Sequence, residues 1–221
     1  MERLGNLSKM MEINKRYIRD IIEEVAPRVE KLSKLEVNLN NLSIEILKKD
    51  TIEKFVEEQF PGIEGLQKYF TFFLFGGMYN HVNQSLNFHE KIYGNEEKFK
   101  VNVGHELMHH AQISSNPVIL LNLSIFDRKD IDSRLIKYGK ALNFLLEGDA
   151  SNIDEQLQNK YYSSAKKRFP LGTKIFCKKI PDEYKLGKKI IREKFGNDRE
   201  KINKLYWEKP GKLVEIFGLN K

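Results

Sequence analysis

Residues 101–112, VNVGHELMHHAQ, contain three histidines and a glutamate, and two of these histidines are spaced for metal binding. His105 and His109 are four residues apart, so on a helix they lie one turn apart on the same face. Two neutral imidazoles at this spacing can bind one metal ion, and zinc suits such nitrogen ligands. Glu106 projects beside the ion, where its carboxylate can take a proton from a water molecule. The pattern HExxH therefore predicts metal-assisted hydrolysis.

A third protein ligand is needed, because a catalytic zinc site has three such ligands and an open position for water. Glu147 in NFLLEGDAS is our candidate. The apolar run at 144–146 predicts that this part of the chain is buried, where a carboxylate is costly unless it is paired or bound to a metal. Gly148 weakens a helix interior, which indicates that another group packs close to it. The competing interpretation is a glutamate on the exposed side of the helix.

The stretches GHELMHH and LLEGDA together resemble the gluzincin group of HExxH metallopeptidases, over about residues 70–160. In that group the third zinc ligand is a glutamate on a second helix, often in the pattern E-G-x-A. The resemblance implies that His105, His109 and Glu147 bind Zn²⁺ and that Glu106 is the general base. It also implies a peptide or protein substrate.

The segment GGMYNHVNQSLNFHEK resembles the edge strand that runs above the cleft in zincins and pairs with an extended substrate. We therefore expect a peptide to lie beside Leu86 to Phe88, held through main-chain hydrogen bonds.

The chain departs from the gluzincin pattern after Glu147. The best-known members carry an aspartate four residues later, which accepts a hydrogen bond from a zinc ligand. Here that position is Ser151, and Asp149 is only two residues on and should point elsewhere. Metal-bound histidines usually donate their second N–H to an acceptor. Ser151, Asp149 and a backbone carbonyl all remain candidates for that acceptor.

Many zincins also have a tyrosine or histidine that stabilises the oxyanion. Tyr184 in DEYKLG is our candidate, because Y-x-x-G at this position resembles small gluzincins. The alternatives are Tyr161 and Tyr162, and a tyrosine in the helical core is the competing interpretation of Tyr184.

Other reactive side chains are interpreted as structural. His110 lies about 100° around the helix from His109, so it does not share the same ion. His81 and His89 fall in residues 72–91, which are predicted below to form a hairpin. We interpret them as exposed or structural; the alternative is that they line the cleft. Cys177, the single cysteine, fits an ordinary position in a basic loop.

Three elements are predicted before the hairpin. Residues 8–34 have helical periodicity, with Pro27 expected to kink or divide the helix. LSIEILKK alternates as a short strand, and DTIEKFVEEQF predicts a helix capped by Asp50.

The elements that carry the site follow. FFLFGGMYNHVNQSLNFHEK predicts two strands with a hairpin turn at NHVNQS. NEEKFKVNVGHELMHHAQIS predicts a helix with two acids in its first turn, and a second long helix covers about residues 130–161. Short helices, broken at FGN and KPG, are expected from Asp182 onward.

These elements predict an α+β fold of the zincin type. A small, mostly antiparallel sheet packs on the HExxH helix, and a largely helical C-terminal half follows. We divide the chain into an N-terminal helical segment (1–40) and a metallopeptidase domain (41–221). That domain comprises the sheet and HExxH helix (41–115) and the helical part (116–221).

The composition indicates in which cellular compartment the protein is expected. The chain has 221 residues, a net charge of +7 and one cysteine, so it forms no internal disulfide. The start of the chain lacks the apolar core of a signal peptide, and no apolar run is long enough for a transmembrane helix. We expect a soluble, cytoplasmic protein with no specific nucleic-acid partner.

Two rival functions remain. One is a latent or inactive zinc-binding protein of the same fold, although retention of Glu106 argues against simple loss of activity. The other is a basic protein that binds nucleic acid or a membrane surface, with incidental histidines.

Overall fold

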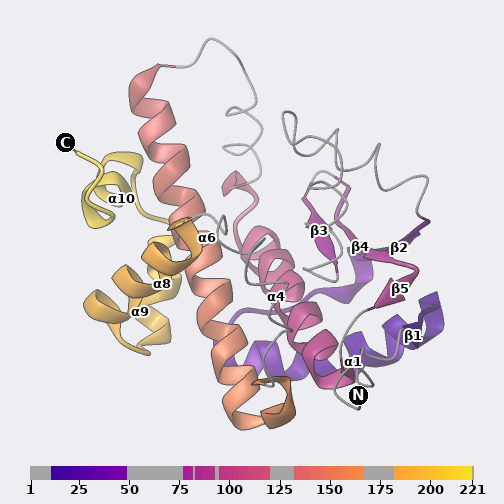
Figure 1. Cartoon of the computed structure of the whole chain (residues 1–221). Coiled ribbons are helices and arrows are strands. Elements are labelled where there is room, and N and C mark those ends of the chain that lie inside the picture. Colours follow the sequence, from indigo (N-terminus) through magenta and orange to yellow (C-terminus); the bar gives the residue numbers. More distant parts are fainter. Residues whose placement is uncertain are drawn as a thin grey trace, which may run out of the picture.

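The structure, a computed structural model, describes residues 11–48, 77–81, 83–92, 95–119, 132–166 and 182–220. Within these ranges the fold is α+β, with six α-helices and a small mixed sheet (Figure 1). The helices are α1 (Lys15–Ser33), α4 (Glu96–Ser115), α6 (Ser133–Lys160), α8 (Asp182–Phe195), α9 (Arg199–Leu205) and α10 (Pro210–Ile216). The strands are β1 (Met11–Glu12), β2 (Ser43–Leu47), β3 (Met78–Asn80), β4 (Ser85–His89) and β5 (Lys91–Ile92). Two short 3₁₀ helices cover Leu39–Asn41 and Ser163–Lys166.

Most predicted elements are present. The predicted strand in LSIEILKK is β2, the hairpin is β3 and β4, and the two long helices are α4 and α6. Helix α1 is continuous through Pro27, so of the two expected effects of this proline, a kink or a division of the helix, the division does not occur. The helix expected at residues 50–60 lies outside the described residues.

The sheet differs from the prediction of a mostly antiparallel one. Its strand order is β2-β4-β3, and β2 runs parallel to β4 whereas β3 runs antiparallel to it. A separate antiparallel pair joins β1 to β5. Because β4 lies between two strands, Leu86 faces Ile44 on one side and Tyr79 on the other. The substrate position predicted beside Leu86 to Phe88 is therefore wrong at Leu86 and Asn87, because β2 and β3 already pair with both edges of β4 there. Phe88 pairs with Ile46 on the β2 side.

Helix α4 lies between the sheet and α6 and packs on α1 (Figure 1). Asn95 caps its start by accepting a hydrogen bond from the backbone N–H of Lys98. Four apolar residues of this helix, Val103, Leu107, Met108 and Ala111, are fully buried, as expected for a helix that packs against several other elements. Helix α1 contributes Ile18, Ile21, Ile22 and Val25 to the same core.

Two glycines allow the helices around the site to approach closely. An added Cβ at Gly104, next to His105, would lie 2.4 Å from Cδ1 of Leu157 on α6. An added Cβ at Gly148, next to Glu147, would lie 2.4 Å from the backbone carbonyl carbon of Gly187 on α8. The close packing inferred from Gly148 is thus present, and it holds α8 directly against the part of α6 that carries Glu147.

None of the helices in the described residues is long and apolar enough to cross a membrane.

Candidate metal centre

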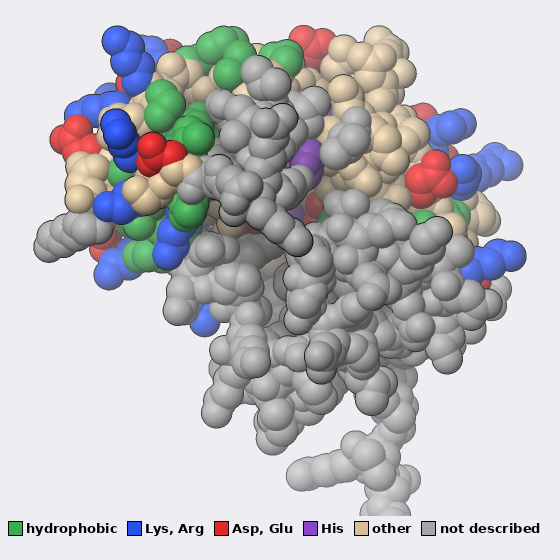
Figure 2. All heavy atoms as spheres, turned by 90° about the horizontal axis from the view of Figure 1, so that it is seen from above, with side chains coloured by type: hydrophobic (Ala, Val, Ile, Leu, Met, Phe, Trp, Pro, Cys, Tyr) green, Lys and Arg blue, Asp and Glu red, His purple; other side chains and the backbone are tan. Residues whose placement is uncertain are grey.

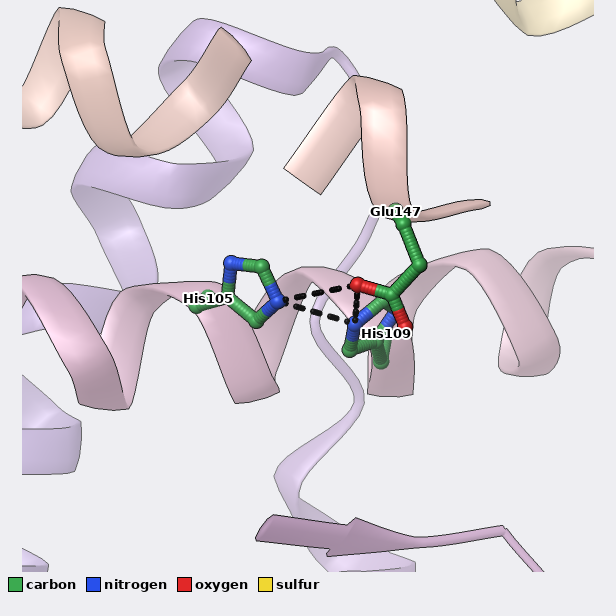
Figure 3. A group of neighbouring side chains, drawn as sticks. All are labelled: His105, His109 and Glu147. Atoms are coloured by element: carbon green, nitrogen blue, oxygen red, sulfur yellow. Dashed lines mark hydrogen bonds and ion pairs between the residues drawn. The ribbon is translucent and has the colours of Figure 1, made fainter. Parts of the chain in front are cut away.

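Helices α4 and α6 bring His105, His109 and Glu147 together (Figure 3). The two Nε2 atoms of the histidines are 3.1 Å apart. Oε2 of Glu147 lies 3.3 Å from Nε2 of His105 and 3.4 Å from Nε2 of His109. These three side chains are therefore close enough to hold one metal ion, as the sequence predicted.

The second nitrogen of His105 faces a carboxylate. Its Nδ1 lies 2.8 Å from Oδ2 of Asp154, which is also on α6. Because a carboxylate only accepts hydrogen bonds, Nδ1 carries a hydrogen, and in the neutral imidazole Nε2 then presents its lone pair. None of the acceptors considered from the sequence has this role. Asp149 pairs instead with Arg199 and Tyr206, and no hydrogen bond joins Ser151 to His105 in the described structure.

The second nitrogen of His109 faces an amide oxygen. Its Nδ1 lies 2.9 Å from Oε1 of Gln112, one turn further along α4. Nδ1 therefore donates here too, and Nε2 of His109, which has a lone pair in the neutral ring, points toward Glu147.

When both imidazoles are neutral, three acceptors thus converge with no hydrogen between them. The two Nε2 lone pairs and Oε2 of Glu147 face one another, and this carboxylate oxygen is buried without a hydrogen bond among the described residues. Three facing lone pairs repel one another unless a cation lies among them. The arrangement therefore favours a bound cation.

The local charge agrees with this conclusion. Burial opposes protonation of His105, but Asp154 and Glu147 outweigh it and raise the pKa of the imidazole well above its usual value. Burial likewise opposes ionisation of Glu147, but His109 and His105 outweigh it and lower the pKa of its carboxyl. The cluster attracts positive charge, so protons and a metal ion compete for it.

Glu106 is buried beside this triad and contacts the sheet. Its Oε2 accepts a hydrogen bond of 2.7 Å from the backbone N–H of Tyr79 on β3. Burial raises the pKa of its carboxyl above the usual value. This hydrogen bond holds the side chain between α4 and the outer edge of β3.

The alternative tyrosines and the third histidine of α4 have other partners. The Tyr162 hydroxyl bonds to Glu24 and Arg28 on α1, and the Tyr161 ring lies against the Arg28 guanidinium. His110 donates from Nε2 to the carbonyl oxygen of Asn38, so its Nδ1 accepts from the Tyr79 hydroxyl.

The remaining candidates are only partly described. Tyr184 belongs to α8, but its side chain lies outside the described part, as does the whole of Cys177. His89 is buried on β4, and His81 lies in the turn before that strand.

The sequence alone does not single out three residues that the structure brings to the site. Asp154 is seven residues after Glu147 and therefore on the same helix face, two turns on. Gln112 is three residues after His109, where side chains of one helix can meet. These spacings are the only sequence signal for either residue. Tyr79 contributes its backbone N–H, which donates to Glu106. Every residue except proline has this group, so the sequence gives no signal for it.

Comparison with protein-family models, with curated proteins and with solved structures found no match to this chain.

Proposed function

We propose that this protein is a zinc-dependent metallopeptidase of the zincin type. The observation that carries the proposal is the convergence of His105, His109 and Glu147 on one point, with the buried carboxylate of Glu106 beside it. Two imidazoles and a carboxylate are the donor set of many hydrolytic zinc sites, in which a fourth position stays open.

The donor spacing supports zinc. With bonds of about 2.0–2.2 Å, two donors of a tetrahedral zinc shell are about 3.3–3.5 Å apart. The three donor atoms here are separated by 3.1, 3.3 and 3.4 Å. Little movement is therefore needed for these side chains to bind the ion. When bound, zinc supplies a Lewis acid that polarises a carbonyl group and lowers the pKa of water.

Glu106 is the proposed general base. Burial is the main cause of its raised pKa, which is therefore closer to pH 7 than that of an exposed glutamate. A carboxylate with such a pKa is a more effective base. One of its oxygens is held by the N–H of Tyr79, which leaves the other to accept a proton from the attacking water. The same oxygen then returns that proton to the amine that leaves when the peptide bond breaks.

The outer edge of β3 is the proposed substrate-binding edge. In an antiparallel pair the N–H and C=O of one residue point to the same side. The Tyr79 N–H points to Glu106, away from β4, so the Tyr79 carbonyl also faces that edge. Because Glu106 already accepts from the Tyr79 N–H, an extended peptide would pair with this edge through the Tyr79 carbonyl, as in strand addition. This replaces the position expected beside Leu86.

Polyanion binding has less support. On the face in Figure 2 the described Lys and Arg side chains lie in separate groups, several of them beside acids, rather than in one patch. Lys100 pairs with Glu24 and Glu96, and Lys188 and Arg192 both pair with Glu155. Such pairs leave less positive charge for a phosphate backbone.

The test is hydrolysis of casein and of a mixed-sequence quenched peptide library by zinc-loaded protein. Wild type should cleave, whereas Glu106→Gln should be slower by a factor on the order of 10²–10⁴ while binding the same amount of zinc. A zinc-loaded wild type that cleaves no peptide would favour the latent or inactive alternative. Equal rates for both proteins would exclude Glu106 as the base.

A further inference from the structure

A buried hydrogen-bond network joins His109 to the C-terminal helices. It runs from His109 through Gln112 to Tyr206, then to Asp149 on α6, and ends at Arg199 at the start of α9. Gln112 and Asp149 are fully buried. A buried polar network is costly unless its members are paired, so a network that reaches a metal-ligand candidate calls for a specific explanation.

The surroundings of Gln112 determine which way its amide faces. Its Nε2 lies 3.1 Å from the carbonyl oxygen of Leu146, which can only accept a hydrogen bond. Nε2 also lies 2.9 Å from the Tyr206 hydroxyl, whose own hydrogen is donated to Asp149 over 2.5 Å. Both neighbours therefore require an N–H donor, and the amide oxygen must face His109.

Arg199 sets the direction of the whole network. Its guanidinium supplies only donors and stays charged. It donates to both oxygens of Asp149, at 2.5 and 2.8 Å, and to the carbonyl oxygen of Ser33 at the end of α1. Asp149 is thereby held as an acceptor for Tyr206. The donor and the acceptor are then defined in every hydrogen bond of the series Arg199–Asp149–Tyr206–Gln112.

The network ends by fixing the tautomer of His109. Oε1 of Gln112 can only accept, so Nδ1 of His109 holds the hydrogen and Nε2 is free to bind a metal. Gln112 also bonds to Leu146, the residue directly before Glu147. One side chain thus orients a ligand on α4 and, at the same time, contacts the backbone beside the ligand on α6.

We propose that Gln112 is a positioning residue of the metal centre. It presets the imidazole of His109 and holds the two ligand helices in register, and Tyr206, Asp149 and Arg199 keep its amide in the required orientation. This inference rests on the metal site of the proposed function and is independent of whether the protein cleaves peptides.

Asn116 offers a matched control. It is a buried amide one turn after Gln112, and its Nδ2 donates to the backbone oxygen of Tyr206 at 2.6 Å. It thus bonds to the same residue from the end of the same helix, but its side chain forms no hydrogen bond with any of the three ligand candidates. Gln112→Met and Asn116→Leu each replace an amide by an apolar side chain of similar size.

The experiment measures the zinc dissociation constant of the full chain by competition with a chromophoric chelator, and thermal unfolding of the metal-free proteins. Both variants should unfold at a lower temperature than wild type. Only Gln112→Met should bind zinc about 10–100-fold more weakly, which is the usual loss when the partner of a metal-bound histidine is removed. The absorption spectrum of the Co²⁺-loaded protein should also change only in Gln112→Met.

Wild-type zinc affinity in Gln112→Met, or an equal loss of affinity in Asn116→Leu, would overturn the inference. If Gln112→Met does not fold, Tyr206→Phe decides, because it removes only the hydroxyl that orients the amide. That variant should show a smaller loss of zinc affinity, and an unchanged dissociation constant would overturn the inference. None of these outcomes depends on peptidase activity, so the two proposals can fail separately.

Discussion

Asp154 accepts a hydrogen bond from Nδ1 of His105 over 2.8 Å, from a position two helical turns beyond Glu147. One face of α6 therefore provides both a ligand candidate and the group that orients another ligand candidate. A carboxylate behind a metal-binding histidine fixes its tautomer and makes the opposite nitrogen a stronger donor to the ion. The spacing of seven residues differs from the four seen in the best-known gluzincins.

Removing the Asp154 carboxylate should weaken metal binding. We expect Asp154→Ala to raise the zinc dissociation constant about 10–100-fold, because His105 loses its acceptor. Ser151→Ala is the control, since Ser151 stands at the position where the gluzincin pattern has its aspartate. Chelator competition should find that Ser151→Ala binds zinc like wild type, and the reverse ranking of the two variants would contradict the assigned hydrogen bond.

The sequence predicted the elements better than their pairing. Helical periodicity and the HExxH spacing locate α4, and glycine and other turn-forming residues locate the hairpin. Both signals are local in the sequence. The parallel pairing of β2 with β4 depends on contacts between segments far apart in the chain. The expected position of the substrate was wrong for this reason, since a strand's place at an edge or in the middle of a sheet is a tertiary property.

For the site too, the sequence predicted the residues marked by a local pattern but not those selected by tertiary packing. His105 and His109 follow from spacing within one helix, and Glu147 follows from an ionisable residue after an apolar run. Asp154 and Gln112 were missed because the sequence contains many residues of these types on helices, and only the packing of α4 against α6 selects two of them.

Adding one methyl group at Gly148 should destabilise the protein. The new Cβ would meet the Gly187 backbone at 2.4 Å, so α8 must move away from α6. We expect Gly148→Ala to lower the free energy of unfolding by about 1–3 kcal/mol. Urea denaturation measures this change.

Gly211 is the control for that substitution, because an added Cβ there has no neighbour within 4 Å. Gly211→Ala should raise the free energy of unfolding by up to about 1 kcal/mol, since alanine restricts the unfolded chain. Equal stability of Gly148→Ala and wild type would contradict the close approach of α6 and α8.

Acidification should weaken the contact between α1 and α4 at Glu24. Burial opposes ionisation of this carboxyl, but hydrogen bonds from Lys100 and Arg28 outweigh it and lower its pKa below the usual 4.5. The folded state thus favours the ionised form. The resulting stability is present above pH 4.5 and is lost as the pH falls through the lowered pKa.

The variant Glu24→Gln cannot lose this charge, so its free energy of unfolding should fall less steeply than that of wild type between about pH 5 and about pH 3. Urea denaturation at several pH values compares the two slopes. Parallel slopes would show that the ion pair of Glu24 with Lys100 does not contribute to acid sensitivity.

The most direct test of the metal centre is elemental analysis of the purified protein after equilibration with zinc and removal of free metal. Wild type should retain about one zinc ion per chain, and Glu147→Ala should retain far less, because it lacks one of the three ligands that a catalytic zinc site requires. A wild type without bound zinc, or a Glu147→Ala protein with the full wild-type content, would contradict the assignment of His105, His109 and Glu147 to one metal ion.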